Sequence, residues 1–331
     1  MTIAISGTTG ITLAGQFDSA STFGFKNRII NGQMQIAQRA TSATITAGST
    51  IAAGYSTVDR FYAYCTGANV TAAQVAGSGA TKNRLQITGA ASVTAVGIGQ
   101  RIEALNSYDM AGSTSTLSVD ISNSLLTTVT WTAYYANTTD TFGTLASPTR
   151  TQIATGTFTV TSTLTRYSTQ ISIPAAATTG IEVVFTVGAQ TSGTWVVGNI
   201  MLEESSTATS FDYRSYGTEL ALCQRYFERS YNIGATTGSF TNGFTAFTNP
   251  LTSTVDVSTN ITFKVTKRDA PTVTVYNVVS GASGAAYRVS DGASISITAL
   301  NYIGMSGVGT LNLGSGSVNT YLIHWIASSE L

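Results

Sequence analysis

The sequence predicts an all-β protein of two domains joined by a single α-helix. Short segments in which apolar and polar residues alternate recur along the 331-residue chain, and clusters of Gly, Ser and Thr separate them. Only residues 216–230 place apolar side chains convincingly at helical spacing. Charged residues make up 10% of the chain and the formal net charge is zero, so hydroxyl and amide side chains fill the polar positions.

Residues 1–26 are predicted to be an N-terminal attachment arm. Ile3, Ile5, Ile11, Leu13 and Phe17 alternate with small or polar residues as strand residues do, but the segment holds too little apolar surface for a core of its own. Such an arm would become ordered by pairing with sister chains or with a docking protein. The alternative is a disordered tail.

Residues 27–215 are expected to form a β-sandwich or barrel domain. Asn31-Gly32 is a turn signal, and the stretch 129–135 is rich in the β-branched and aromatic residues that strands favour. Many short strands linked by Gly- and Ser-rich turns are typical of sandwiches and barrels. The other strands predicted in this domain are 84–88, 116–121, 158–160, 167–173 and 181–187.

A connecting helix is predicted over residues 216–230, where Leu220, Cys223 and Phe227 recur at three- and four-residue spacing. Gly217 and Thr218 offer a loop and an N-cap, and a carboxylate in the first turn is favoured by the helix dipole. Because β-rich sequence lies on both sides, this helix is the expected hinge between two domains.

Residues 231–331 are expected to form a second, β-rich distal domain. Alternation in 261–265, 272–276 and 294–300 indicates strands, and Pro271 ends or edges one strand before the next begins.

Several short motifs follow one another in a definite order along residues 27–230. They are Asn31-Gly32, Gln38-Arg39, Asp59-Arg60-Phe61, Gln100-Arg101-Ile102-Glu103, Met201-Leu202-Glu203, Ala208-Thr209-Ser210-Phe211 and Glu219 to Tyr226. Their order resembles tail-fibre and virion-surface proteins of tailed bacteriophages, with Ala37 and Phe61 as small departures. Arg268 to Val273 and Trp325 to Leu331 resemble the C-terminal domain that often follows the helix in these fibre proteins.

The resemblance implies a fold and a function. The first domain would be a jelly-roll β-sandwich similar to carbohydrate-binding modules, and the chain would be a bacteriophage tail fibre protein, usually a homotrimer. It would be made in the host cytoplasm and carried in the virion tail. Its N-terminal region would attach to a tail or baseplate protein, and its distal domain would adsorb to a host surface polysaccharide or lipopolysaccharide. One alternative is a decoration protein of the head or tail without receptor binding.

A second alternative, a polysaccharide depolymerase, would need two carboxylates at a defined separation, and Glu182, Glu203 and Asp120 are the candidates. Depolymerases of this kind usually resemble long parallel β-helices, and no such repeat is present. We therefore predict that the chain is not an enzyme.

Metal and cofactor sites are not expected. One histidine, His324, and two distant cysteines cannot build a zinc site, and no calcium loop or phosphate-binding loop accompanies them. Cys65 and Cys223 are expected to be small buried hydrophobes, with a disulfide between them as the alternative.

The composition also excludes two classes of partner. The scattered basic residues do not suit nucleic acid, whose phosphates require a face rich in lysine and arginine. No apolar run has the length of a membrane span, and residues 1–10 lack the features of a signal peptide.

Aromatic side chains supply faces on which sugars stack, so the aromatic residues of the distal domain are the candidate glycan contacts, although aromatic residues more often belong to the core. In the first domain, alternation predicts that Trp131 and Tyr135 share one face of a strand if no bulge intervenes, while Tyr134 points to the other. The candidate contacts are Tyr231, Phe240, Phe244, Tyr276, Tyr287 and Tyr302.

Overall fold

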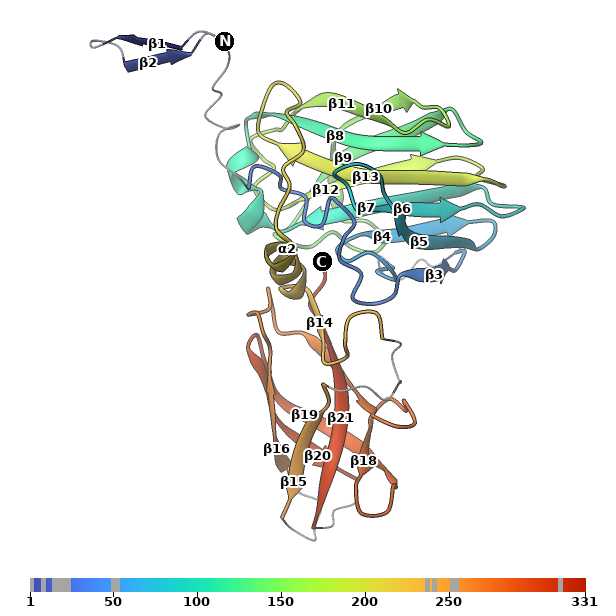
Figure 1. Ribbon diagram of the computed structural model, residues 1–331, viewed down its shortest axis with the longest axis vertical. Helices are drawn as coiled ribbons and strands as arrows, with labels where there is room; N and C mark the ends of the chain where they lie inside the picture. The colour runs from blue at the N-terminus through green and yellow to red at the C-terminus, as the bar shows by residue number, and fades with distance from the viewer. Residues whose placement is uncertain are drawn as a thin grey trace.

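The computed structural model of the chain describes residues 3–6, 10–13, 25–48, 54–235, 239, 243–250, 256–314 and 318–331. It confirms an all-β protein with a jelly-roll-like sandwich. Figure 1 shows the sandwich above a narrower β-rich domain, with helix α2 and the end of the chain between them.

Two antiparallel sheets build the first domain. The five-stranded sheet runs in the order β10 (Arg150–Thr159), β9 (Thr128–Ala136), β12 (Ile181–Val187), β7 (Ala95–Ile102) and β4 (Tyr62–Thr66). The six-stranded sheet runs β11 (Thr165–Ser172), β8 (Thr114–Asn123), β13 (Thr194–Glu203), β6 (Asn83–Thr88), β5 (Val70–Ala76) and β3 (Ser42–Ile45). Two short 3₁₀ helices, η1 (Ala104–Asn106) and η2 (Tyr108–Met110), lie between β7 and β8.

The core of the sandwich lies between the two sheets because alternate residues of each strand point inward. Trp195, Leu117 and Ile98 are fully buried there. Trp131 lies in the same core with Tyr135 packed against it, whereas Tyr134 belongs to a separate cluster on the opposite face, as the alternation predicts. Cys65 is buried in this core and its thiol is free, as is that of the buried Cys223.

The N-terminal hairpin consists of β1 (Ile3–Ser6) and β2 (Gly10–Leu13). The two strands pair with each other, and the register sets Ile3 opposite Leu13 and Ile5 opposite Ile11. The remaining residues of the predicted arm up to Gly24, Phe17 among them, lie outside the described residues.

Helix α2 (Tyr216–Gln224) is shorter than the predicted 216–230. Its N-cap position is Ser215, not Thr218, and the hydroxyls of these two residues lie 2.8 Å apart. The chain leaves the helix because residues 227–229 pair with the last strand of the distal domain and form β14 (Phe227–Arg229). Tertiary pairing here overrides the helical spacing of Leu220, Cys223 and Phe227.

The distal domain is organised around its last strand, β21 (Asn319–Ser328), which pairs with β14, β15, β17 and β18. Phe247, Leu311, Tyr321 and Trp325 lie in its core. The other strands are β15 (Thr245–Asn249), β16 (Asp256–Thr262), β17 (Thr272–Asn277), β18 (Ala285–Arg288), β19 (Ser294–Gly304) and β20 (Gly307–Leu313).

The junction between the domains is cross-linked by buried polar contacts. The Gln38 side-chain amide donates to the main-chain oxygen of Phe227 at 2.9 Å. In turn, Arg229 Nη1 donates to the main-chain oxygen of Gln38 at 2.6 Å. Cys223 and Tyr226 form a small buried cluster with Ile30 and with Ile36 from the first domain. The segment around α2 is therefore packed against the first domain.

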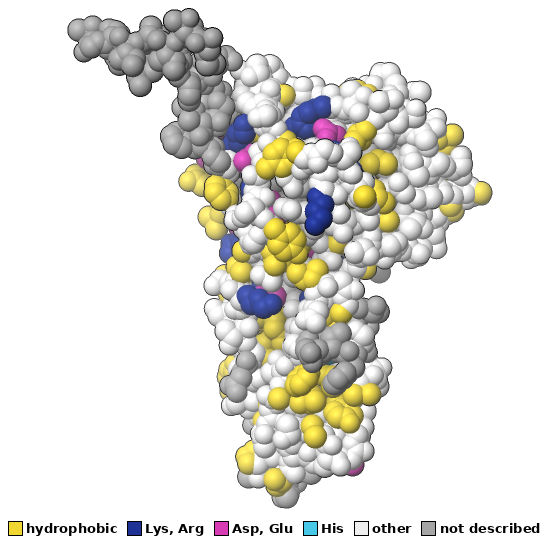
Figure 2. Space-filling model, viewed as in Figure 1, with side chains coloured by type: hydrophobic (Ala, Val, Ile, Leu, Met, Phe, Trp, Pro, Cys, Tyr) yellow, Lys and Arg dark blue, Asp and Glu magenta, His cyan; other side chains and the backbone are white. Residues whose placement is uncertain are grey.

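Charged side chains are sparse on the face of the molecule shown in Figure 2, as the composition requires. Several charges instead lie inside. Lys267 and Glu228 are both fully buried and form an ion pair at the start of the distal domain, where Lys267 also donates to the main-chain oxygens of Gln224 and Val265.

Lys267→Met should destabilise the protein by about 3–5 kcal/mol, because it leaves the Glu228 carboxylate buried without its cation. Denaturant unfolding measures the loss. Lys82→Met, at an exposed lysine, is the matched control and should change little. The double variant Lys267→Met/Glu228→Gln should recover most of the loss; a double variant as unstable as the single one would contradict this explanation.

Glu219 provides a pH test. Burial raises the pKa of its carboxyl group, although Arg214 and the Asn31 N–H favour the charged form. The native state then holds the proton more tightly than the unfolded state, so stability is greatest below the unfolded pKa of about 4.3 and falls as pH rises through the raised value. Denaturant unfolding from pH 4 to pH 7 should show this fall in the wild type relative to Glu219→Gln, and parallel curves would refute it.

Candidate functional site

A cluster of tyrosines lies on the outer face of the five-stranded sheet, opposite the core. We call Tyr62, Tyr64, Tyr134, Arg150 and Glu182 the tyrosine face. They come from four strands, and the register aligns Tyr134 with Glu182 across β9 and β12.

Alternation and two glycines explain the position of the tyrosines. Ala63 and Cys65 of β4 point into the core, so Tyr62 and Tyr64 must point outward. Their partners on β7 are Gly99 and Gly97, and a Cβ at either glycine would overlap the ring that lies across it. The missing side chains on β7 therefore leave room for the rings to lie across the neighbouring strand.

The tyrosine rings differ in depth. Tyr62 is fully buried and its hydroxyl donates to Glu182 Oε1 at 2.8 Å. The ring of Tyr64 is nearly parallel to it, at 21° and 6.5 Å between centroids, and is half-buried. Tyr134 is also half-buried, and the Arg150 guanidinium lies 4.0 Å from its ring centroid.

Glu182 holds the cluster together although it has no exposed surface. Arg101 Nε donates to its Oε1 at 2.8 Å, and Arg150 pairs with its Oε2. Burial raises the pKa of the Tyr62 and Tyr64 phenols, an effect that Arg150 opposes at both residues. The phenols therefore keep their protons at neutral pH and remain hydrogen-bond donors.

Hydroxyl and amide side chains surround the tyrosines on the same face. These side chains lie in rows that cross β10, β9 and β12. The rows lie beside Tyr134 of β9 and continue towards Tyr62 and Tyr64 of β4. A surface with aromatic rings on one side and hydroxyls on the other can stack on a sugar ring and hydrogen-bond to its hydroxyls. The surrounding side chains are Thr130, Thr132, Gln152, Thr155, Thr157 and Thr186.

The aromatic residues proposed from the sequence are dispersed in the distal domain. Tyr231 is 4% exposed and stacks on the buried His324, with ring centroids 3.9 Å apart. Tyr276 meets Tyr231 edge-on at 6.4 Å and is half-buried. Phe240 lies outside the described residues.

The other three distal residues are more accessible and come from different elements. Tyr302, next to the β19–β20 turn, is 79% exposed, and Phe244, just before β15, is 36% exposed. Tyr287 is half-buried on β18. The structure thus brings together Tyr231 and Tyr276, and of the six only Tyr302 offers a largely open ring among the described residues.

The three carboxylates considered for glycoside cleavage are engaged by other groups. Asp120 pairs with Arg84 and Arg166, and Glu203 accepts from the Thr209 hydroxyl at 2.7 Å. Glu182 is pinned by two arginines, as described above. Such ion pairs and hydrogen bonds favour a structural role for these carboxylates.

No group of three or more metal-ligating side chains is present in the described part of the chain, and none of its helices has the length and apolarity to span a membrane.

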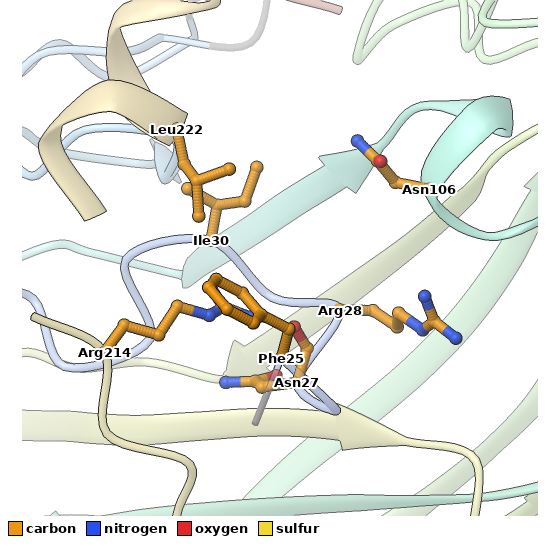
Figure 3. Close-up of a pocket in the computed structure, with 7 residues that line it drawn as sticks. All are labelled: Phe25, Asn27, Arg28, Ile30, Asn106, Arg214 and Leu222. Carbon is orange, nitrogen blue, oxygen red and sulfur yellow. The ribbon is translucent and has the colours of Figure 1, made fainter. Parts of the chain in front are cut away.

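A hollow of about 190 Å³ beside α2 is a second candidate for a ligand-binding site (Figure 3). Its polar groups are largely engaged already. Arg28 pairs with Asp109, and Arg214 donates to the main-chain oxygens of Ile29 and Asn27. The hollow is lined by Phe25, Asn27, Arg28, Ile30, Asn106, Arg214 and Leu222.

Two further hollows differ in chemistry. One of about 340 Å³ is lined mainly by hydroxyls of Thr116, Ser168 and Thr169 and by the 206–208 loop, and contains no aromatic ring. The other, about 310 Å³, is mostly apolar and lies between β17 and β19 of the distal domain. Neither combines an aromatic ring with hydrogen-bonding groups as the tyrosine face does.

The tyrosine face is not evident from the amino-acid sequence alone. A signal was present: Tyr62 and Tyr64 are two residues apart on a strand, and so are Gly97 and Gly99. What the sequence lacks is the pairing of β4 with β7, which brings these two patterns together.

Gly97→Ala should destabilise the protein by about 1–3 kcal/mol, because the new methyl group displaces the Tyr64 ring. The same substitution in a Tyr64→Ala background should cost far less, and denaturant unfolding of the four proteins in this cycle measures the difference. Equal costs in both backgrounds would mean that the ring does not occupy this position.

No family model and no curated protein matches the sequence of this chain. Among solved structures, the enzymatically active domain of a tailspike protein of bacteriophage CBA120 is similar over 54% of this chain but 21% of its own, with 15% identity and a TM-score of 0.34.

Carbohydrate-binding modules are similar over a comparable part of the chain. TmCBM61, solved with β-1,4-galactotriose, matches 54% of this chain and 99% of its own at 8% identity and a TM-score of 0.33. The C-terminal family 22 module of a Clostridium thermocellum protein matches 48% of this chain and 94% of its own at 14% identity and a TM-score of 0.31. At TM-scores this far below 0.5, the similarity assigns no family, site or ligand to this chain.

Proposed function

We propose that this chain binds a glycan of the bacterial surface through the tyrosine face and serves as a bacteriophage tail fibre protein. One observation supports binding: half-buried Tyr64 and Tyr134 lie on the same face of a sheet as several threonine hydroxyl groups. Glycans are recognised by stacking on aromatic rings and by hydrogen bonds to their hydroxyl groups.

Preorganisation favours this site over the dispersed aromatics of the distal domain. Within the tyrosine face, Tyr62 and Glu182 are buried, and Glu182 holds Arg150. The groups that support Tyr64 and Tyr134 are therefore already fixed. Fixed groups lose little conformational entropy when a ligand binds. The exposed Tyr302 remains a proposed contact of its own in the distal domain.

The tail-fibre role places the N-terminal region on a tail or baseplate protein. The β1–β2 hairpin supports this proposal, because an isolated two-stranded hairpin is marginally stable in water and gains from a partner. A homotrimer and a location in the virion tail complete the proposal, and both rest on the resemblance of the sequence motifs to fibre proteins.

Tyr64→Ala should lower the affinity for the recognised glycan at least about tenfold, which corresponds to ~1.4 kcal/mol. The protein is first applied to an array of bacterial surface polysaccharides and lipopolysaccharides, and titration calorimetry with the best glycan then compares the variants. Tyr64→Phe keeps the stacking ring and should retain most of the affinity. Tyr108→Ala, at a tyrosine on η2 that is 58% exposed, is the matched control.

Other results would change the assignment. If Tyr302→Ala abolishes binding and Tyr64→Ala does not, recognition belongs to the distal domain. If the wild-type protein binds no glycan on the array and no intact host cell, yet assembles on the virion, a decoration protein replaces the receptor-binding role.

A further inference from the structure

The tyrosine face is continuous with the end of the distal domain. Arg101 of β7 donates from Nε to Glu182 and from Nη1 to the main-chain oxygen of Leu331, each at 2.8 Å. Its third nitrogen, Nη2, donates to the main-chain oxygen of Gly143 at 3.2 Å. A single buried guanidinium therefore joins the carboxylate beneath the face to the segment that follows β21.

Tyr55 makes a second connection. Its hydroxyl donates to the same Leu331 oxygen at 3.4 Å, and its ring meets the Tyr62 ring edge-on, at 82° and 6.0 Å. The Leu331 oxygen is thus shared by two side chains, and both of them contact the buried layer of the tyrosine face.

Glu330 anchors this segment in the first domain. Its carboxylate pairs with Arg60 and, at 3.1 Å, with Arg39, and its side chain is only 8% exposed. Arg60 also donates to the main-chain oxygen of Arg101 at 2.6 Å and lies 3.5 Å from the centroid of the Tyr226 ring. The two arginines come from the Gln38-Arg39 and Asp59-Arg60 motifs of the first domain.

We propose that Glu330 and Leu331 position the tyrosine face, so that docking of the distal domain and glycan binding by the first domain are thermodynamically coupled. The proposal rests on the proposed glycan-binding function of that face. When the Glu330 carboxylate no longer pairs with Arg39 and Arg60, Leu331 is no longer held in position. Arg101 then loses the Leu331 main-chain oxygen as a hydrogen-bond acceptor. Arg101 then holds Glu182 less firmly, and Tyr62, which donates to Glu182, supports the Tyr64 ring less rigidly.

Coupling of this kind is reciprocal. A glycan that favours the ordered tyrosine face must also favour the docked distal domain by the same factor, and such couplings are typically about 5- to 150-fold. Arg101 and Glu330 are positioning residues in this scheme, because neither reaches the outer surface where the glycan would lie.

Glu330→Ala is the test variant, with Glu330→Gln as a milder change that keeps the shape of the side chain. Asp291→Ala is the matched control, because it removes a distal-domain carboxylate whose ion pair with Arg288 is exposed and remote from the junction. Hydrogen–deuterium exchange of β4 and β12 is measured without ligand, under conditions where circular dichroism shows each variant to be folded. Titration calorimetry then measures the affinity for the array-selected glycan.

The expected result is faster exchange in β4 and β12 and an affinity at least about fivefold lower for Glu330→Ala, a smaller change for Glu330→Gln, and none for Asp291→Ala. Unchanged exchange overturns the positioning role, and faster exchange with unchanged affinity overturns the coupling. If the wild type binds no glycan, the proposed function and the coupling fail together. The exchange experiment needs no ligand, so it still decides whether Glu330 positions the tyrosine face.

Discussion

The pairing of buried charges at the domain junction is the constraint on which the rest of the structure depends. Asp59 is fully buried and accepts from the Gln38 main-chain N–H at 2.9 Å and from the Gln38 amide at 2.5 Å. Arg60, next to it, is 1% exposed, and the carboxylate that forms its ion pair is Glu330 of the other domain. Because an unpaired buried charge is strongly destabilising, the ion pairs of Glu330 with Arg60 and Arg39 hold the two domains together. The junction motifs thereby fix where the distal domain sits.

The fold class followed from local patterns, whereas the tyrosine face did not. Strand 181–187 was predicted with the boundaries that β12 has, because its apolar side chains and flanking turns are local features. Phe227 was assigned to a helix because its spacing from Cys223 suits one, and its pairing with Ser328 lies about a hundred residues away in the chain. The tyrosine face depends likewise on the pairing of β4 with β7, which no local pattern encodes. Such long-range partners override local preference.

The same distinction applies to the motifs on which the resemblance to fibre proteins rests. Asn31 adopts a φ of 61° and its side-chain amide donates to the main-chain oxygens of Ile36 and Asp59. Gly32 packs against the Ile200 main chain, where a Cβ would overlap a carbonyl oxygen. These residues make structural contacts within the first domain and do not belong to the tyrosine face. Motifs that suggest a resemblance can therefore report how domains are joined and not what they bind.

The ion pairs described above have a consequence for how the molecule meets a surface. Nearly every lysine and arginine is engaged by a carboxylate, often inside the protein, and the net charge is zero. Charges paired this closely project almost no field beyond a Debye length, which is about 8 Å at physiological ionic strength. For the proposed binding to a cell surface, encounter would then depend on diffusion and short-range contact more than on long-range electrostatic attraction.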